Sequence, residues 1–343
     1  MESPVHFLTA VALQQQRLKL EDRQDVMTSD FVVATDPISP PAGLERAVYA
    51  IGNFDGLHLG HRAVIERTIV LARERDAPSA VLTFEPHPAD HFAERPVAFR
   101  LTPPELKASI CQRLGLLGIV FLTFNASLAA MSSEEFVRSI LVERLGAGAV
   151  VVGWDFHFGK GRSGTPTSLV DAGSRYGFEV DVVRKVEEGV GEAARVVSST
   201  AIRRALERGD VAGAALALGR CYSVSGRVTP GQRLGRTLGV PTANMALAPT
   251  NRLAHGVYAV RALIDGEFHP GVASFGVRPT IDNGSPLLEV HLFDFEGDLY
   301  GKEISVEFVE RIREERKFES IDLLVAEMHR DKERAHAILA RRG

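Results

Sequence analysis

The sequence predicts an α/β domain with a doubly wound, mostly parallel sheet, followed by a small antiparallel β-barrel and a C-terminal helix. Three observations indicate this fold class. Apolar strand-like runs alternate with amphipathic helical runs from Ala47 to about Val186, as in sheets with helices on both faces. After Cys221, short alternating segments are separated by Gly, Pro and Asp-Gly turns, which is typical of small barrels. From Ser320 onward the apolar residues have helical spacing.

The first domain is expected to contain five strands joined by helices. The strands are AVYAI (47–51), SAVLTFE (79–85), GIVFLTF (118–124), AVVVGWDF (149–156) and FEVDVV (178–183), and the helices follow His61, Thr102, Ser132 and Thr167. Ligands of such sheets bind outside the carboxyl ends of the strands. We therefore expect the site in GNFDGLHLGH, EPHP and FHFGKGRSGTP, the loops after the first, second and fourth strands.

The second domain is expected to be built from five longer strands and a strand-like PTAN segment. The longer strands are YSVSGRV (222–228), GVYAVRALI (256–264), GVASFGV (271–277), LEVHLFDF (288–295) and ISVEFVERI (304–312). Ser320 and Asp322 suit the first turn of the terminal helix. An apolar stripe is expected to pack this helix on the barrel, and it comprises Ile321, Leu324, Val325, Met328, Ala335 and Ile338.

These patterns divide the chain into four parts. They are an N-terminal extension (1–28), the α/β domain (29–205), an Ala-rich helical linker (206–220) and the barrel with its helix (221–343). Residues 1–26 precede Met27 and are polar and glutamine-bearing. We interpret them as a poorly ordered extension or the product of an upstream start codon.

Composition excludes several classes of protein. The 343 residues carry a net charge of −4 with interspersed signs, so no electrostatic footprint indicates a nucleic-acid partner. The two cysteines, Cys111 and Cys221, are far apart, which argues against a disulfide framework or a zinc site. The sequence has no apolar run near the roughly 18 residues of a membrane span and no convincing secretory signal. These features favour the cytoplasm, and they leave the oligomeric state open.

The loop GNFDGLHLGH carries the first candidate site. Its glycines let the backbone approach a ligand, and the amides at the start of the following helix suit an anion such as phosphate. His58 and His61 can donate imidazole N–H groups to phosphate oxygens where charge develops during transfer. A metal site with further ligands from EPHPADHF (85–92) and an ordinary polar role for each histidine remain open.

A second segment, VSSTAIRRAL (197–206), opens another helix. The hydroxyls of Ser198, Ser199 and Thr200 can cap it, and its amides together with Arg203 can face an anion. Either role is compatible with the residues alone. Together with the histidine loop at the same sheet edge, this segment makes a nucleoside triphosphate the economical ligand.

In the barrel, PTAN and LEVHLFDF carry the third candidate site. A strand would place Thr242 and Asn244 on one face, with Ala243 and Met245 opposite. Two neutral oxygen donors beside nucleotide phosphates suit Mg²⁺. Glu289 alternates with apolar neighbours and is the candidate general base for a substrate hydroxyl. An exposed strand carboxylate is the alternative.

The pattern GxFDGxHxGH, followed by SSTxIR more than a hundred residues later, resembles the adenylylating half of bacterial bifunctional riboflavin kinase/FAD synthetases, in the HxGH nucleotidyltransferase superfamily. VVGWDFHFGKGRSG (151–164) resembles the VGxDFxFGxxRxG stretch of that family. In the second half, GRTLGVPTAN, the EVHLFDF strand and the RxExKF run at 313–318 resemble the riboflavin kinase domain. The resemblance extends from about Ala47 to the end of the chain.

This resemblance implies two successive reactions. The barrel would phosphorylate riboflavin with ATP to FMN, with Glu289 deprotonating the ribityl 5′-hydroxyl, and the first domain would adenylylate FMN with ATP to FAD. His58, His61 and Arg203 would serve the second reaction. The resemblance implies cofactor-binding roles for Gly52, Asn53, Phe54, Asp55, Gly60, Ser199, Thr200, Gly235, Arg236, Thr242, Asn244 and Arg313, with Mg²⁺ held at Thr242 and Asn244. SFGVRPTIDNG (274–284) would bound the flavin site.

Two residues depart from the family pattern. Leu234 stands where glycine is frequent and Val240 where phenylalanine is common, which bears on nucleotide affinity and loop mobility.

Three other hypotheses about function stay open. The alternatives are an adenylyl- or cytidylyltransferase for another phosphate ester with a regulatory flavin-binding barrel, a non-catalytic flavin carrier, and a metal-dependent phosphohydrolase that uses His58, His61, His87 and His91.

Overall fold

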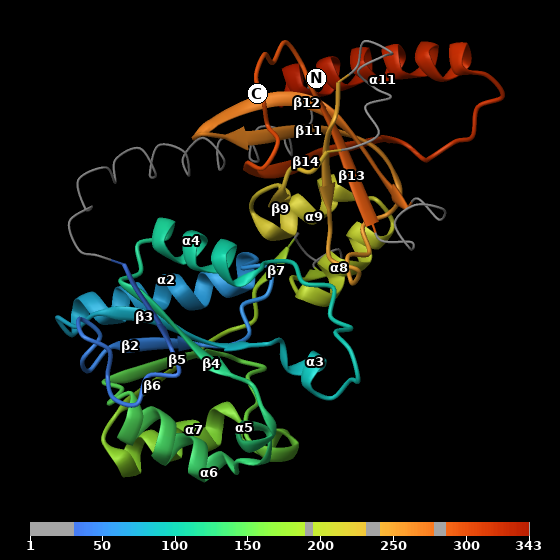
Figure 1. The fold of residues 1–343 in the computed structure, drawn as a ribbon. Coiled ribbons are helices and arrows are strands. Elements are labelled where there is room, and N and C mark those ends of the chain that lie inside the picture. The colour runs from blue at the N-terminus through green and yellow to red at the C-terminus, as the bar shows by residue number, and fades with distance from the viewer. Residues whose placement is uncertain (1–30, 189–194, 231–240, 278–285, 343) are drawn as a thin grey trace, which may run out of the picture.

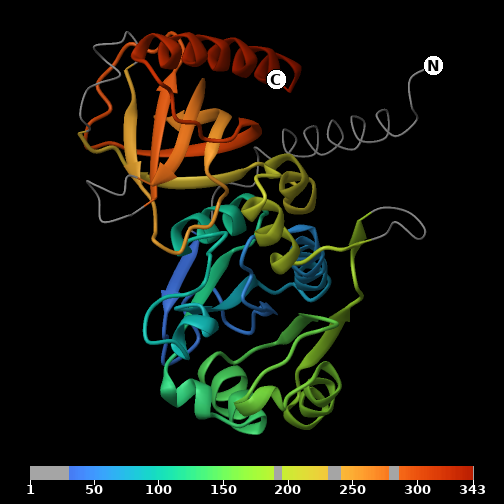
Figure 2. The same ribbon diagram turned by 90° about the vertical axis from the view of Figure 1, so that its right-hand side faces the viewer.

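The structure, a computed structural model, describes residues 31–188, 195–230, 241–277 and 286–342. A helix-covered sheet forms one lobe and a smaller strand-rich domain forms the other, with two short helices between them (Figures 1 and 2). The expected order of α/β domain, antiparallel barrel and terminal helix is confirmed. The predicted extension 1–28 lies outside the described residues.

Six parallel strands form the first sheet, in the order β1-β4-β3-β2-β5-β6. They are β1 (Val32–Thr35), β2 (Val48–Ile51), β3 (Ser79–Glu85), β4 (Gly118–Thr123), β5 (Ala149–Gly153) and β6 (Glu179–Val183). The five predicted strands are confirmed. The short edge strand β1 is not among them, because four residues of alternating half-burial give a weak sequence signal. Strand order reverses between β2 and β5, so the loops after these strands lie at the switch point where such sheets bind ligands.

Helices cover both faces of this sheet, as a doubly wound fold requires. On one face α2 (Leu59–Glu74) and α4 (Pro104–Arg113) pack on Val48 and Ala50 of β2. On the other, the π-helix η1 (Phe136–Arg144) and α7 (Pro166–Tyr176) pack on Tyr49 and Ile51. The shorter elements are α3 (Pro88–His91), α5 (Ala126–Ala130), α6 (Ser133–Glu135) and the 3-10 turn η2 (Lys160–Arg162), followed after β6 by the paired strands β7 (Glu187–Glu188) and β8 (Arg195–Val196).

The second sheet is antiparallel and curls toward a barrel. Its order is β10-β13-β12-β11-β14-β9. The strands are β9 (Tyr222–Arg227), β10 (Ala243–Ala246), β11 (Gly256–Ile264), β12 (Glu267–Val277), β13 (Pro286–Leu292) and β14 (Glu303–Arg313). The two edges approach each other where the Thr229 amide donates to the Asn244 carbonyl over 2.9 Å. This contact brings the PTAN segment next to the end of β9.

The terminal helix α11 (Ile321–Arg341) packs across the barrel, as expected (Figure 1). Ser320 caps it by accepting a hydrogen bond from the Leu323 amide. The predicted stripe is wrong at Ile321, which is 62% exposed, whereas Leu324, Val325 and Met328 are half-buried. The buried positions of this helix are Glu327, Asp331, Ala335 and Ile338. The inward face of α11 carries the carboxylates of Glu327 and Asp331 because Arg313 of β14 lies opposite them.

Two helices, α8 (Ser199–Glu207) and α9 (Val211–Leu218), connect the lobes. Their buried residues share one apolar core with the barrel strands, and that core also contains Phe99 and Leu101 from the first domain. The predicted boundary between residues 205 and 206 falls inside α8, and the domain limits stay a prediction. No helix in the described ranges is long and apolar enough to cross a membrane.

Candidate active sites

The histidine loop joins β2 to α2 in an unusual backbone conformation. Phe54, Gly56 and Leu57 have φ angles of +48°, +92° and +45°. Residues other than glycine rarely adopt this left-handed region, and they do so where the surrounding structure holds them. The loop shape is therefore fixed by its contacts with the rest of the domain.

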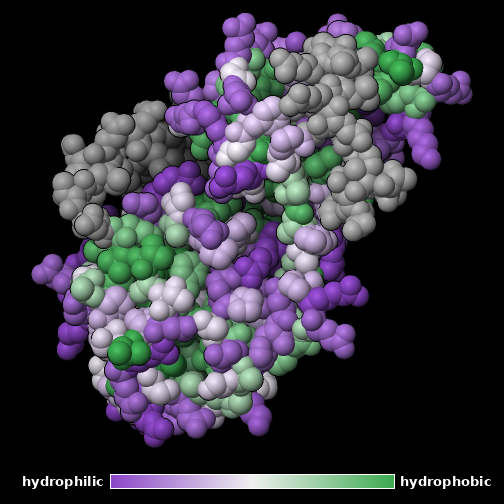
Figure 3. Space-filling view, in the orientation of Figure 1, coloured by the Kyte–Doolittle hydropathy of each residue, from purple (hydrophilic) through white to green (hydrophobic). Residues whose placement is uncertain are grey.

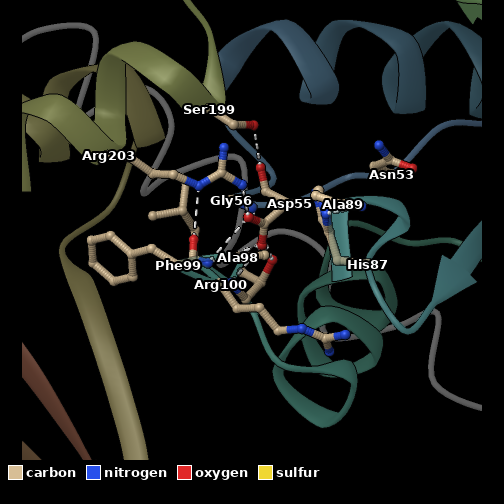
Figure 4. A network of polar contacts seen from close by, with 12 residues as sticks. Asn53, Asp55, Gly56, His87, Ala89, Ala98, Phe99, Arg100, Ser199 and Arg203 are labelled. Carbon is tan, nitrogen blue, oxygen red and sulfur yellow. Dashed lines mark hydrogen bonds and ion pairs between the residues drawn. The ribbon is translucent and has the colours of Figure 1, made fainter. Parts of the chain in front are cut away.

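Asp55 supplies most of those contacts, as Figure 4 shows. Its buried carboxylate accepts hydrogen bonds from the Leu101 amide over 2.9 Å and the Thr102 amide over 3.0 Å. Arg203 Nη2 lies 2.5 Å from Asp55 Oδ2, and Ser199 Oγ donates to the Asp55 carbonyl over 2.7 Å. Asp55 thus ties together three segments that are distant in the sequence. Its role toward a cofactor stays a prediction.

His58 and His61 form a compact pair at the first turn of α2. Their rings stack with centroids 3.6 Å apart, and His58 Nδ1 accepts the His61 amide over 3.2 Å. Gly60 permits this arrangement, because a Cβ there would come within 3.1 Å of His58 Cε1. The pair stands at the helix N-terminus, where an anion is favoured.

Both histidines are held neutral at ordinary pH. Burial, opposed in part by the charge of Asp55, lowers the pKa of His58 to about 4. Burial and the neighbouring His58 lower the pKa of His61 well below its usual value. The amide on His58 Nδ1 favours the tautomer with its proton on Nε2. The pair can therefore donate hydrogen bonds to a phosphate without carrying full positive charges.

Asn53 contributes its backbone to a second network, at the end of β3. Its carbonyl accepts from Lys107 Nζ over 2.9 Å and from Thr83 Oγ1 over 3.0 Å. Lys107 Nζ also lies 3.3 Å from Glu85, which pairs with Arg100 over 2.6 Å. Sequence analysis missed Lys107. Its spacing from Ile110 and Cys111, which places all three on the buried face of α4, was the available signal.

The SSTAIR segment begins α8 as expected. Ser198 is its N-cap and accepts from the Ala201 amide over 3.2 Å. Thr200 is exposed, and Arg203 Nε donates to the Phe99 carbonyl over 2.7 Å. Ser199 and Arg203 are therefore brought to the histidine loop through Asp55. That they hold phosphate remains a prediction.

The alternative metal site finds little support in the EPHPADHF segment. Glu85 is engaged by two cations, and Asp90 Oδ1 accepts from the amides of Val97 and Ala98, each over 2.8 Å. His87 Nδ1 accepts the Ala89 amide at the start of α3. Across the described ranges, no group of three or more His, Cys, Asp or Glu side chains is arranged to hold a metal ion.

A row of residues crosses the barrel sheet at the second site. Strand register sets Asn244 opposite Glu289, and Glu289 opposite Ser274. The row continues through Val257 of β11 to Arg313 of β14. Residues on the other face, such as Met245 and Leu288, lie in the core. The expected alternation is confirmed from Ala243 onward, and it brings Asn244 and Glu289 onto one face.

Asn244 fits a role as a metal ligand. It is 5% exposed, and its Oδ1 is buried with no hydrogen-bond partner among the described residues. Its Nδ2 donates to the Thr242 carbonyl over 3.3 Å, which fixes the amide so that Oδ1 is the remaining acceptor. A buried oxygen without a donor suits a hard cation. Thr242 is half-buried and lies just before β10, so its place on the face of Asn244 stays a prediction.

Arg313 is anchored to α11. Its Nη2 lies 2.7 Å from Asp331, with both side chains buried, and its Nε lies 3.8 Å from Glu327. Asp331 was missed from the sequence, although a charged residue in line with Ala335 and Ile338 signals a buried ion pair. The predicted contact of Arg313 with a cofactor is untested. The predicted residues Gly235 and Arg236 and most of the 274–284 segment lie outside the described residues.

The fold and these two sites define a two-domain enzyme of phosphate transfer. Residues 41–201 match the family model of FAD synthetase, and residues 218–339 match that of riboflavin kinase. A bifunctional riboflavin kinase/FMN adenylyltransferase from Pseudomonas fluorescens is 42% identical over 85% of this chain and 93% of its own length. The chain belongs to the family of bifunctional riboflavin kinase/FMN adenylyltransferases.

Other relatives agree with this membership. The bifunctional riboflavin kinase/FMN adenylyltransferase of Escherichia coli strain K12 is 40% identical over 84% of this chain and 91% of its own length. That of Bacillus subtilis strain 168 is 36% identical over 84% and 92%. A crystal structure described as a macrolide-efflux protein from Streptococcus pneumoniae has a TM-score of 0.77 at 30% identity, covering 88% of this chain and 97% of that one.

Proposed function

We propose a division of work between the two sites of this bifunctional riboflavin kinase/FMN adenylyltransferase. The barrel phosphorylates riboflavin with ATP to give FMN and ADP. The α/β domain then joins FMN to the AMP part of a second ATP, giving FAD and pyrophosphate. The observation that carries the proposal is the register that sets Asn244 opposite Glu289, because it gives the barrel a phosphate-transfer site separate from the histidine pair.

In the kinase reaction Glu289 acts as the general base. Its carboxylate takes the proton of the ribityl 5′-hydroxyl as that oxygen bonds to the γ-phosphorus of ATP. The bond from the γ-phosphorus to the β,γ-bridging oxygen breaks, and ADP leaves. Positioning and charge stabilisation supply most of the catalysis in such transfers. Glu289 lies in the middle of a strand with neighbours on both sides, which gives its carboxylate a rigid base.

Asn244 and Thr242 are the proposed Mg²⁺ ligands, with MgATP as the nucleotide form. The partnerless Oδ1 of Asn244 supports this assignment. When bound, Mg²⁺ supplies charge neutralisation on the nucleotide phosphates. His291 Nδ1, 2.9 Å from the Pro241 carbonyl, holds the start of the segment in place.

In the adenylylation reaction an oxygen of the FMN phosphate bonds to the α-phosphorus of ATP, and pyrophosphate leaves. His58 and His61 donate hydrogen bonds to the phosphate oxygens where charge develops. Because both rings are neutral, they stabilise the charge of the transition state without attracting bound phosphates as strongly as cations would. Ser199, Thr200 and Arg203 are proposed to hold the outgoing pyrophosphate.

The working environment is inferred to be the cytoplasm, and the partners are inferred to be small molecules. Both cysteines are free thiols, which supports a reducing compartment. The interspersed charges of the sequence support independence from nucleic acid.

The test is the flavin composition formed by two variants from riboflavin, ATP and Mg²⁺, separated by chromatography over time. Glu289→Gln should cut FMN formation by about 10²–10⁴-fold while FAD formation from supplied FMN persists. His58→Ala should keep FMN formation and lose about 2.7–4 kcal/mol of transition-state stabilisation in FAD formation.

Matched controls separate chemistry from folding. Glu267→Gln removes an exposed carboxylate from β12 of the same sheet, and both activities should survive it. Normal FMN formation by Glu289→Gln would remove the assigned base and would favour a regulatory flavin-binding barrel or a flavin carrier, since neither needs one. Loss of both activities in either variant would indicate misfolding.

A further inference from the structure

Arg220 lies where the linker, the barrel and the first domain meet. It follows Gly219, which ends α9 in a left-handed conformation, and it precedes β9. A Cβ at Gly219 would come within 2.7 Å of Arg62 Nη1 and 2.9 Å of Leu59 Cδ2. The end of α9 is therefore packed directly on the first turn of α2, the helix that begins after His58.

Two nitrogens of the Arg220 guanidinium are buried without a partner. Its Nε and Nη1 are inaccessible to water and have no hydrogen-bond partner in the described part of the chain. Buried donors in native proteins are almost always paired, so an unpaired one calls for a partner such as a water, an ion or a ligand. A guanidinium is costlier to leave unpaired than a neutral donor, because it carries a charge.

The charged groups around Arg220 do not neutralise it. Arg62 and Arg113 act on it as like charges, and burial together with these charges lowers the pKa of Arg220 to about 10, so it stays protonated at neutral pH. The nearby carboxylates are Glu307 and Asp55. Among the described residues neither carboxylate bonds to Nε or Nη1 of Arg220; Asp55 is instead bonded to Arg203, and Glu307 lies near Arg261 and Arg113 as well as Arg220. The cluster formed by Arg62, Arg113 and Arg220 thus has excess positive charge.

The cluster is also within electrostatic reach of the histidine pair. The charges of Arg203 and Arg220 both contribute to the low pKa of His58. Figure 3 shows hydrophilic and hydrophobic residues side by side between the two lobes on the face drawn. A ligand that satisfied Arg220 would therefore lie close to the start of α2.

We propose that Arg220, with Arg62 of α2 and Arg113 at the end of α4, binds a phosphate group of a substrate or product of FAD formation. Guanidinium groups match phosphate oxygens in pairs of parallel hydrogen bonds. The phosphate belongs to FMN, to ATP or to pyrophosphate. This inference rests on the proposed adenylylation and adds a subsite, supplied by the linker, to its active site.

Steady-state FAD formation from supplied FMN and ATP tests the proposal. Arg220→Ala should raise the KM for the substrate whose phosphate is bound, or the inhibition constant of inorganic pyrophosphate, by about 10–100-fold, the scale of a lost charged hydrogen bond. A rise in the KM for FMN, in the KM for ATP or in the inhibition constant of pyrophosphate identifies which of these molecules supplies the bound phosphate. Arg220→Lys should recover part of the loss. Arg204→Ala, which removes an exposed arginine from α8, should leave all three constants unchanged.

Two further variants keep the result interpretable. Arg220→Met fills similar space without the donors, so full recovery of every constant by it would overturn the proposal. Arg113→Ala alters an exposed side chain and should raise the same constant by a smaller factor. This variant keeps the proposal testable if Arg220→Ala folds poorly. Unchanged constants in a folded Arg220→Ala would also overturn it. Failure of the proposed function would appear instead as absence of FAD with the unaltered protein.

Discussion

Asp55 and Arg203 form a contact of 2.5 Å between residues that are 148 positions apart. The pair joins the histidine loop to α8, and its side chains are only 5% and 22% exposed. Removing one partner of such a buried pair leaves the other charge uncompensated, which is strongly destabilising. Asp55 therefore shapes the first site through its contacts, whatever else it does there.

We expect Asp55→Asn to lower the free energy of unfolding by about 3–5 kcal/mol and to reduce FAD formation more than FMN formation. The amide cannot accept from Leu101, Thr102 and Arg203 as a carboxylate does. Urea unfolding and the two flavin assays measure this. Glu66→Gln, an exposed change on α2, is the control. Equal stability of Asp55→Asn and the unaltered protein would contradict the assignment.

Acidification should destabilise the protein through His58. Its pKa is about 4 in the folded protein, whereas an unperturbed histidine has a pKa of 6.5, so the unfolded chain binds the proton first as the pH falls. Stability is then lost between about pH 6.5 and pH 4, by up to about 3 kcal/mol. His58→Gln should make this part of the curve of unfolding free energy against pH less steep, and the part that remains should come from His61, whose pKa is also lowered by burial. His157→Gln, which alters an exposed histidine, should leave it as it was.

The same pKa shift predicts how activity depends on pH. Because His58 and His61 stay neutral, FAD formation should show no histidine ionisation between about pH 6 and pH 8. A rate profile measured with supplied FMN checks this. The prediction fails if the rate falls with a midpoint near the ordinary histidine pKa and this fall is absent in His58→Gln. That result would show that the pKa of His58 is not lowered in the folded protein.

Asn244→Ala should weaken the binding of the Mg²⁺ that supports FMN formation. Removing the partnerless Oδ1 takes away one proposed ligand, and we expect the half-saturating Mg²⁺ concentration to rise by about tenfold or more. The Mg²⁺ dependence of FAD formation in the same variant is the internal control and should not change. Identical Mg²⁺ curves for FMN formation in a folded variant would rule out Asn244 as a ligand.

The clamp between Arg313 and Asp331 should be needed for stability. Asp331→Ala leaves a buried guanidinium poorly paired, and we expect a loss of about 3–5 kcal/mol in urea unfolding. The double variant Arg313→Met, Asp331→Leu should recover most of that loss, since it replaces both charges with apolar groups. FMN formation by the stable double variant then tests the predicted nucleotide contact of Arg313. Failure of the double variant to regain stability would contradict the clamp.

Much of the architecture follows from local sequence patterns. Runs such as AVYAI and SAVLTFE give strands because they are apolar and bounded by turn residues, and strand period alone places Asn244 and Glu289 on polar faces. Their direct opposition across β10 and β13 depends on strand register. Register is set by tertiary packing, so it is not readable from either segment alone.

Long-range partners limit what sequence reasoning can provide. The motif FDG gives no sign that Asp55 accepts amides 46 and 47 residues further on. The apolar pattern misjudges α11 for a related reason, because burial of Glu327 and Asp331 depends on Arg313 in a different element. The contacts of Lys107 are partly foreseeable, since its helical spacing already marks a buried position.

The segment that bonds to Asp55 also supplies Phe99 to the core of the barrel. Phe99 and Leu101 share that core with α8, α9 and the strands, and the Phe99 ring meets Tyr222 edge to face with centroids 6.2 Å apart. The two enzymes are therefore fused through their interiors as well as through one peptide chain. Separating the two domains at the linker would expose apolar side chains on both. Each domain would then need polar substitutions on that surface to be stable as an independent protein.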